Sequence, residues 1–424
     1  MPSSFCLDFV YPSLKKDTEN LIQTHFAKEG KLSYRVYDNC YAAPAHSLLN
    51  ANGEHCLGGG LIHNGEWVYN SGLNLHSLTP YEFDYKNVEY IDEEVIYIGI
   101  ISSVWGHAIT DGLQHLWWFL TKDYLDNHRD KTIYYWGEHP LSGNYLELLR
   151  LIGIDVSRLK FITRTILFKS VIVPDSSFVS NYPTGTHYFY EYVNTIDHII
   201  AHCKFRPNSE KKVFISELSN SRNWGIKSIE KIAKKNGYKI IHPADLSLLE
   251  MIFILQGADD VMTFESSVGH NVVFCKPKTK IAILRKANYV NSYQSVINQI
   301  RDFDITIIDV HLSLMNNERF PYAGPFFVYA NSNFCRYLNV QASPFPLSLL
   351  MKYFRYNLLD GEQSLNAKLC VPKNYIQILS NELDKSFNHF SQEYSRSVSF
   401  LPLPDSIKKR IIRKLVRSRI NRII

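Results

Sequence analysis

Between residues 213 and 285 the chain alternates short apolar runs with segments of helical periodicity. Strands are predicted at Val213–Ser216, Tyr238–Ile241, Val261–Phe264 and Lys280–Arg285, and helices at Lys227–Asn236 and Leu246–Gly257. Strands that alternate with helices form βαβ units, whose strands pair in parallel within one sheet. This segment therefore predicts an α/β fold.

A less regular alternation precedes it. Strands are predicted at Val95–Ile101, Thr132–Trp136 and Leu167–Pro174, and helices at Asn144–Ile152 and Tyr188–Cys203. The polar stretch 204–212 is predicted to be a linker. We therefore expect two Rossmann-like α/β domains that face a cleft between the carboxyl ends of their strands. The expected parts are 1–205, 206–345, a helical segment 346–405 and a basic tail 406–424.

Composition excludes several classes of protein. Eight Lys or Arg and no acid occur in residues 408–424, and without them the chain has 38 basic against 41 acidic residues. The main part of the chain is therefore mildly acidic, which argues against a nucleic-acid partner. The seven cysteines have no paired spacing and are expected to be reduced thiols. We find no signal peptide, no apolar run long enough to span a bilayer and no metal site, and Asp302-Phe303-Asp304 is discounted as a chance DxD match.

Residues 1–90 are turn-rich, and they contain a run of three glycines at 58–60. Such a run can bind phosphate, but the Lys-Ser/Thr pair of a P-loop does not follow it. A turn is the preferred interpretation.

The segment Trp105–Leu120, WGHAITDGLQHLWWFL, has the apolar spacing of a helix of about four turns. Its apolar side would face a core, and the opposite side would carry His107, Asp111, Gln114 and Trp118. Asp111 lies four residues after His107 and can reach its ring. The polar side is either a functional surface or an ordinary solvent-exposed face, and the pattern leaves both open.

A second candidate site follows the strand predicted at Val261–Phe264. In the sequence ESSVGHN, Ser266, Ser267 and Gly269 would let backbone N–H groups approach an anion, and His270 and Asn271 could add donors. The alternative is a serine-capped helix with a tight turn. Arg222, in the loop after the first strand of this half, could bind a second phosphate or could simply be solvated.

Several segments together resemble glycosyltransferase family 61, especially its bacterial surface-polysaccharide branch. WGHAITDGLQHLW is similar to the family's W-G-H-x-x-x-D helix, and FKSVIVPDSSF to its strand that ends in Pro-acid. VFISELSNSRNW resembles its I-S strand and R-x-W loop, and LSLLEMIFILQGADDVMTFESSVGHNVVFCKP its later helix, strand and His-Asn turn. The ordered set covers about residues 95–285, with a weaker match at 325–337.

The resemblance implies a GT-B fold and inverting, metal-independent transfer from a nucleotide sugar, UDP- or CMP-linked, with no other cofactor. Asp111 would be the general base and His107 its neighbour, with Gln114 and Trp118 on the acceptor side. The donor would contact the residues of the second half: Arg222, Glu250, Ser266, Ser267, Gly269, His270 and Asn271. Many members carry Arg directly after I-S, where this chain has Glu217, so phosphate binding would depend on Arg222 alone.

Two other functions remain open. His107-x-x-x-Asp111-Gly112 is also the HxxxDG signature of acyltransferases, with His107 as the base, although their second Asp-Phe-Gly-Trp motif is absent. A non-catalytic glycan-binding or scaffold subunit is the third possibility.

The tail is predicted to be a basic amphipathic helix. Ile411, Ile412, Leu415 and Val416 fall on one side, and Arg410, Arg413, Lys414 and Arg417 on the other. Such a helix suits an anionic membrane surface, and the alternative is a helix docked on the acidic body of the protein. We therefore expect a cytoplasmic enzyme, peripheral on the inner face of the cytoplasmic membrane, that acts on capsule or lipopolysaccharide glycans carried by lipid.

Overall fold

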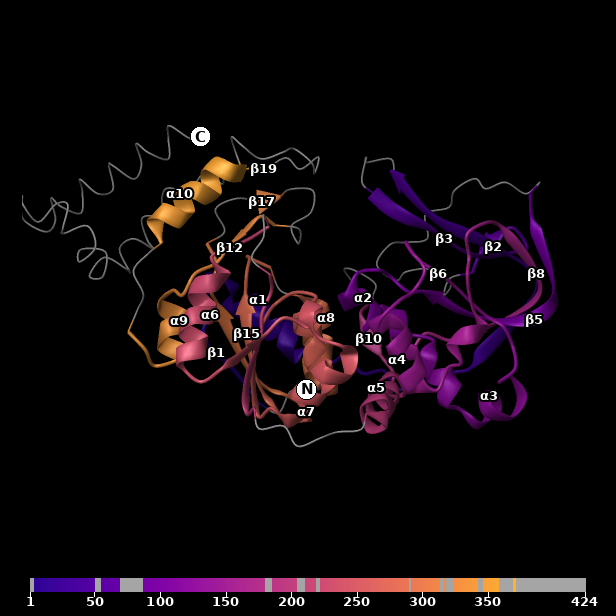
Figure 1. Cartoon of the computed structure of the whole chain (residues 1–424), viewed down its shortest axis with the longest axis horizontal. Coiled ribbons are helices and arrows are strands. Elements are labelled where there is room, and N and C mark those ends of the chain that lie inside the picture. Colours follow the sequence, from indigo (N-terminus) through magenta and orange to yellow (C-terminus); the bar gives the residue numbers. More distant parts are fainter. Residues whose placement is uncertain are drawn as a thin grey trace, which may run out of the picture.

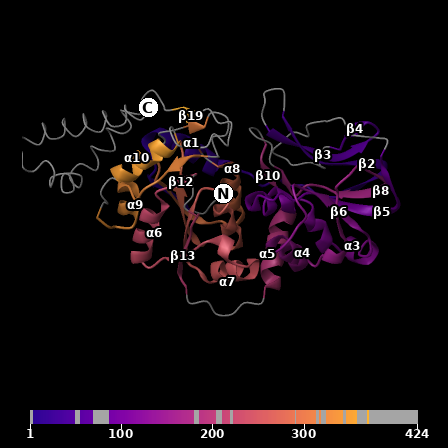
Figure 2. The same cartoon turned by 45° about the horizontal axis from the view of Figure 1, so that its top comes forward.

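The structure is a computed structural model. It describes residues 4–49, 55–68, 87–179, 185–203, 210–218, 222–289, 291–312, 316–317, 324–341, 346–357 and 369–370. Figures 1 and 2 show two sheets at opposite ends of the long axis, with helices α4 and α5 between them. The predicted basic helix of the tail lies outside the described residues.

The second half of the chain forms a six-stranded, fully parallel sheet in the order β1-β16-β15-β14-β11-β13. Its strands are β1 Ser4–Phe9, β11 Lys212–Ile215, β13 Lys239–Ile241, β14 Asp260–Phe264, β15 Lys280–Arg285 and β16 Asp304–Asp309. The central strands are buried on both faces, which matches their continuous apolar sequences. The predicted parallel sheet is confirmed here.

The N-terminal segment does not follow the predicted boundary. The prediction placed residues 1–205 together, whereas β1 pairs with β16 in the second sheet, Ser4 opposite Asp304. Helix α1, Pro12–Gln23, follows it there, because the Arg285 guanidinium donates to the Thr18 hydroxyl over 2.9 Å. The chain therefore starts in the second half and then crosses to the first.

The first half is a seven-stranded mixed sheet in the order β4-β3-β2-β8-β5-β6-β7. Its strands are β2 Tyr34–Leu49, β3 His55–His63, β4 Glu66–Trp67, β5 Glu89–Ile100, β6 Ile133–Trp136, β7 Leu159–Phe161 and β8 Ile166–Pro174. Strands β8, β5, β6 and β7 are parallel, but β2 and β3 form an antiparallel hairpin beside β8. The three strands predicted in this half correspond to β5, β6 and β8, and their parallel pairing is confirmed, whereas the antiparallel hairpin of β2 and β3 was not predicted.

The glycine run is part of this hairpin and not a turn. Gly58, Gly59 and Gly60 lie within β3. A Cβ on Gly59 would lie 3.2 Å from the buried Trp136 ring, and the φ of Gly59, +137°, also disfavours a side chain. Close packing on Trp136 therefore explains glycine at position 59.

Helices cover both sheets. They are α2 Trp105–Ala108, α3 Lys122–Asn127, α4 Asn144–Ile152, α5 Tyr190–His202, α6 Ile226–Lys235, α7 Leu248–Gly257, α8 Ser292–Ile300, α9 Ser332–Tyr337 and α10 Leu347–Arg355. Short 3-10 segments lie at Asp111–Leu113, Leu116–Leu120, Val156–Arg158, Pro243–Asp245 and Gly269–Phe274. Two-residue strands complete the set: β9 Phe178–Val179, β10 His187–Tyr188, β12 Asn223–Trp224, β17 Asn316–Asn317, β18 Phe326–Phe327 and β19 Leu369–Cys370. Within the described ranges, no helix has the length and apolarity needed to cross a bilayer.

One apolar core connects the two halves. Ile109 and Tyr192 of the first half belong to the same buried cluster as Val272 and Phe274 of the second. Polar contacts reinforce this junction: the Asn144 amide donates to the Leu246 carbonyl, and Arg301 forms an ion pair with Asp197 at 2.5 Å. The relative position of the two sheets is therefore determined by packing.

Candidate functional site

The segment Trp105–Leu120 is not the single helix that was predicted. It is divided into the short helix α2 and two 3-10 turns, Asp111–Leu113 and Leu116–Leu120. The break occurs at Thr110, whose ψ of −99° is not helical. A Cβ on Gly112 would lie 3.1 Å from the His107 carbonyl oxygen, so glycine permits the tight turn there.

This break buries three of the four residues that were expected on an exposed polar side. Asp111, Gln114 and Trp118 are all buried. Trp118 packs against Tyr34, with their ring centroids 5.0 Å apart. Gln114 and Trp118 therefore offer no surface to an acceptor, and the expectation that they lie on the acceptor side is not met.

The predicted contact between His107 and Asp111 is confirmed. Nδ1 of His107 lies 3.0 Å from Oδ1 of Asp111, and the Thr110 hydroxyl lies 2.9 Å from the same oxygen. Because a carboxylate can only accept, Nδ1 carries the proton when the ring is neutral, and Nε2 then has the lone pair. The His107 side chain is 30% exposed and that of Asp111 is fully buried. His107 is therefore the member of the pair that a substrate can reach.

The surroundings of His107 favour its protonated form. Burial opposes the charge, but the Asp111 carboxylate and its hydrogen bond outweigh burial and raise the pKa of His107. Glu138 acts in the same direction. Its carboxylate accepts hydrogen bonds from the Ser102 hydroxyl and the Ser103 N–H, and so fixes the turn that leads into α2.

Helix α2 lies at the junction of the two halves (Figure 1), and it contacts the turn that follows β14. The Trp105 indole N–H donates to Oδ1 of Asn271 over 2.7 Å. A Cβ on Gly106 would lie 2.9 Å from the Ser267 hydroxyl oxygen and 3.0 Å from Nδ1 of His270. The sequence therefore brings its two candidate segments, WGH and SSVGHN, into direct contact.

His270 and Asn271 are the residues of the turn that lie against Gly106 and Trp105. Asn271 is buried and its side-chain N–H donates to the Val268 carbonyl, so its amide is used within the protein. His270 stacks on Tyr293 at a centroid distance of 6.0 Å. Burial, and then the nearby His107, lower the pKa of His270 to about 4. Neither residue lines the cavity described next.

A cavity of about 350 Å³ lies at the carboxyl ends of β11, β13, β14 and β15. Arg222, Ser266 and Ser267 line it, as predicted for residues that bind a ligand in the second half. Gly269 is buried next to it, where a Cβ would lie 2.4 Å from the Phe264 carbonyl oxygen. Glu250 does not line the cavity, since its carboxylate caps α7 by accepting from the Ser247 N–H over 2.9 Å. The helix predicted after the turn is a 3-10 segment of six residues, Gly269–Phe274.

The cavity also contains an ion pair that was not predicted. Nζ of Lys286 lies 2.8 Å from both carboxylate oxygens of Glu217, and both side chains are almost fully buried. The departure from the family pattern at Glu217 is therefore accompanied by a second cation next to Arg222. Lys286 follows the strand predicted at Lys280–Arg285 directly, and this position at a carboxyl strand end could have identified it.

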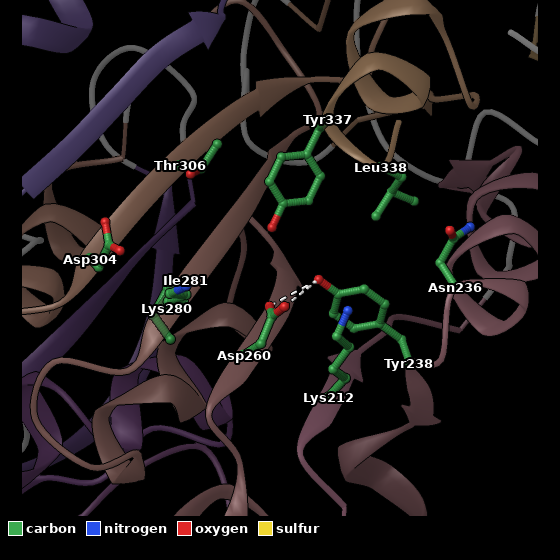
Figure 3. A pocket seen from close by; sticks show the side chains of 10 residues that line it. All are labelled: Lys212, Asn236, Tyr238, Asp260, Lys280, Ile281, Asp304, Thr306, Tyr337 and Leu338. Atoms are coloured by element: carbon green, nitrogen blue, oxygen red, sulfur yellow. Dashed lines mark hydrogen bonds between the residues drawn. The ribbon is translucent and has the colours of Figure 1, made fainter. Parts of the chain in front are cut away.

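A second cavity, of about 390 Å³, lies at the opposite edge of the same sheet (Figure 3). Lys212, Asp260, Lys280 and Asp304 stand side by side at the starts of four neighbouring parallel strands, with alternating charge. The hydroxyls of Tyr238 and Tyr337 point toward Asp260. Ligands of open α/β sheets bind at the carboxyl ends of the strands, so the first cavity is the candidate site. Across the described ranges, no cluster of His, Cys, Asp and Glu could hold a metal ion, and Asp302 and Asp304 form none.

One family model matches part of the chain. Residues 105–282 match the family model of Glycosyltransferase 61. The match begins at the first residue of α2 and ends within β15, so it includes the His107–Asp111 pair and the Ser266–Asn271 turn. No curated protein matches the chain. Over residues 105–282 the chain is therefore similar to glycosyltransferase family 61.

Proposed function

We propose that this protein is an inverting, metal-independent glycosyltransferase with a GT-B-like arrangement of its two sheets. It would transfer a sugar from a nucleotide-sugar donor to a hydroxyl group of a glycan acceptor. The main support is one observation: Gly106, which directly precedes His107, lies against Ser267, and Ser267 lines the cavity at the strand ends.

In this proposal His107 is the general base. Inverting transfer needs a group that takes the proton of the attacking hydroxyl. Asp111 was the residue expected from the sequence, but it is fully buried and cannot touch an acceptor. The Asp111 carboxylate instead holds the proton on Nδ1 of His107, so that Nε2 faces the substrate as the acceptor atom. Asp111 is thus a positioning residue.

The donor would bind in the cavity of the second half. Arg222 supplies a positive charge for the departing phosphate, and Ser266 and Ser267 supply hydroxyl donors. The Oγ atom of Ser266 is buried and has no hydrogen-bond partner among the described residues, so it is available to a ligand. We propose a UDP- or CMP-linked sugar as the donor.

The acceptor and the location of the enzyme are also proposals. A growing capsule or lipopolysaccharide glycan on a lipid carrier fits a cytoplasmic enzyme that binds the inner face of the membrane through its basic tail. Nucleic acid is not an expected partner, because the chain without residues 408–424 is mildly acidic.

The acyltransferase alternative uses the same base. The exposed His107 and the buried Asp111 have the roles that the HxxxDG signature requires, so this geometry does not separate the two reactions. The family match favours glycosyl transfer. The acyl donor would be a thioester and the glycosyl donor a nucleotide sugar, so a direct assay of the two donor classes distinguishes them.

The test is an assay of nucleotide release from a panel of nucleotide sugars with oligosaccharide acceptors. His107→Gln should lower turnover by about 10²–10⁴-fold, the usual contribution of a general base, and should leave donor binding unchanged. Only neutral His107 can accept a proton. Wild-type activity should therefore decrease as the pH is lowered through the raised pKa of His107. Full activity of His107→Gln would exclude the proposed base, and His25→Gln, at an exposed histidine, is the control.

A further inference from the structure

The Glu217–Lys286 pair lies in a cavity where an ion pair is costly. Both groups lose most of their hydration, and the attraction between buried charges often only offsets that loss. A buried ion pair is therefore poor evidence for a purely stabilising role. Both side chains line the candidate cavity, so a ligand that enters can reach the pair.

The three hydrogens of the Lys286 ammonium group are all directed at partners within the protein. Two of its hydrogens are directed at the two Glu217 oxygens at 2.8 Å, and the third is directed at Oδ1 of Asn223 at 3.3 Å. The ring of Phe326 lies 4.5 Å from Nζ. An anion can bind Lys286 closely only if Glu217 gives up part of this contact.

Lys286 and Arg222 line the same cavity. Asn223, which contacts Lys286, is the next residue after Arg222, and both cations line the same cavity from different strand ends. The described lining of the cavity thus includes the cationic side chains of Arg222 and Lys286 and the carboxylate of Glu217. Lys286 lies beyond the segment that matches the family model.

We infer that Lys286 binds a phosphate group of the ligand, and that this phosphate displaces Glu217 from Lys286. This inference rests on the proposed function and adds to it a phosphate-binding residue and the carboxylate that competes for it. Two cations that line one cavity can contact both phosphates of a diphosphate, so Lys286 should favour a diphosphate over a single phosphate. Glu217 competes with the phosphate for Lys286, which weakens binding and speeds release of the diphosphate product.

The experiment measures binding of inorganic pyrophosphate and inorganic phosphate by calorimetry with the full chain. Wild-type protein should bind pyrophosphate more tightly than phosphate. Glu217→Gln should bind pyrophosphate several-fold more tightly than wild type, because the competing charge is gone. Lys286→Met leaves Glu217 buried without a cation and can misfold, so the informative comparison is with the double variant Glu217→Gln/Lys286→Met.

The double variant should bind pyrophosphate at least tenfold more weakly than Glu217→Gln. Equal affinity of these two variants would overturn the inference, as would tighter binding of phosphate than of pyrophosphate by wild type. Lys211→Met, an exposed lysine outside the cavity, is the matched control and should not change affinity.

Failure of this inference can be told apart from failure of the proposed function. If the double variant transfers sugar from a nucleotide sugar with an unchanged KM, the Lys286 inference is wrong and the transferase proposal stands. If wild type binds pyrophosphate through Lys286 but uses no nucleotide sugar, the transferase proposal fails and Lys286 remains a diphosphate-binding residue.

Discussion

The stability of the junction between the two halves should depend on pH through His270. This histidine is buried, its ring nitrogens have no well-formed hydrogen bond within the described residues, and its pKa is lowered from 6.5 to about 4. The unfolded chain takes up a proton near pH 6.5, whereas the folded protein resists until about pH 4. The contribution of His270 is therefore complete above pH 6.5 and is lost as the pH falls toward 4.

The expected size follows from linkage. Each pH unit between the two pKa values changes the free energy of unfolding by about 1.4 kcal/mol, so His270 should account for a loss of about 2 kcal/mol between pH 6.5 and pH 5. His107 has a raised pKa, and its contribution is complete below its unfolded pKa and lost as pH rises through the folded one. The contribution of His107 therefore changes mainly above pH 6.5, and it does so in wild type and in the His270 variant alike.

The assay compares urea-induced unfolding of wild type and His270→Gln at pH 7.5 and pH 5. Glu265 and Asp309, whose pKa values burial raises, change stability in the opposite direction, but they do so equally in both proteins. Wild type should lose about 2 kcal/mol more than His270→Gln between the two pH values. The same loss in both proteins would refute the reasoning, and His25→Gln should behave like wild type.

Two further predictions concern the junction and the tail. Gly106→Ala should lower the free energy of unfolding by about 1–3 kcal/mol, because the added Cβ would lie 2.9 Å from Ser267. The substitution should also reduce sugar transfer. An unchanged Tm together with full activity would contradict the packing described. Truncation after Asp405 should leave a folded protein that no longer sediments with anionic liposomes. The truncated protein should keep its activity on short water-soluble acceptors. Equal sedimentation of the full-length and truncated proteins would exclude the membrane role of the tail.

The sequence predicted several local elements with their bounds, although the helix predicted at Trp105–Leu120 is broken. The helix Asn144–Ile152 and the strand Lys280–Arg285 have the predicted bounds, because an apolar periodicity and a continuous apolar run mark them. The pairing of strands depends on contacts between distant segments. The alignment of Ser4 with Asp304 and the antiparallel hairpin of β2 and β3 could not be derived from local pattern.

In the candidate site, too, a contact between residues close in sequence could be predicted, and a contact between distant segments could not. The spacing of His107 and Asp111 was sufficient to predict their contact, since the two residues are one turn apart. Glu217 and Lys286 are 69 residues apart, and they meet because β11 and β15 both flank β14 in the sheet. The order of the strands, which the sequence does not state, determines that contact.

The proposed general base is His107 and not Asp111, the residue expected from the sequence, for a related physical reason. A helical wheel assumes a continuous helix, and on a continuous helix His107, Asp111, Gln114 and Trp118 would share one face. The non-helical Thr110 ends that regularity, so Asp111 turns inward and accepts from the Thr110 hydroxyl while His107 remains accessible. A buried carboxylate that holds an exposed imidazole is a better proton acceptor than either group alone, because the charge that develops on His107 is stabilised by Asp111. The break in the helix is therefore what makes the pair suitable for the proposed chemistry.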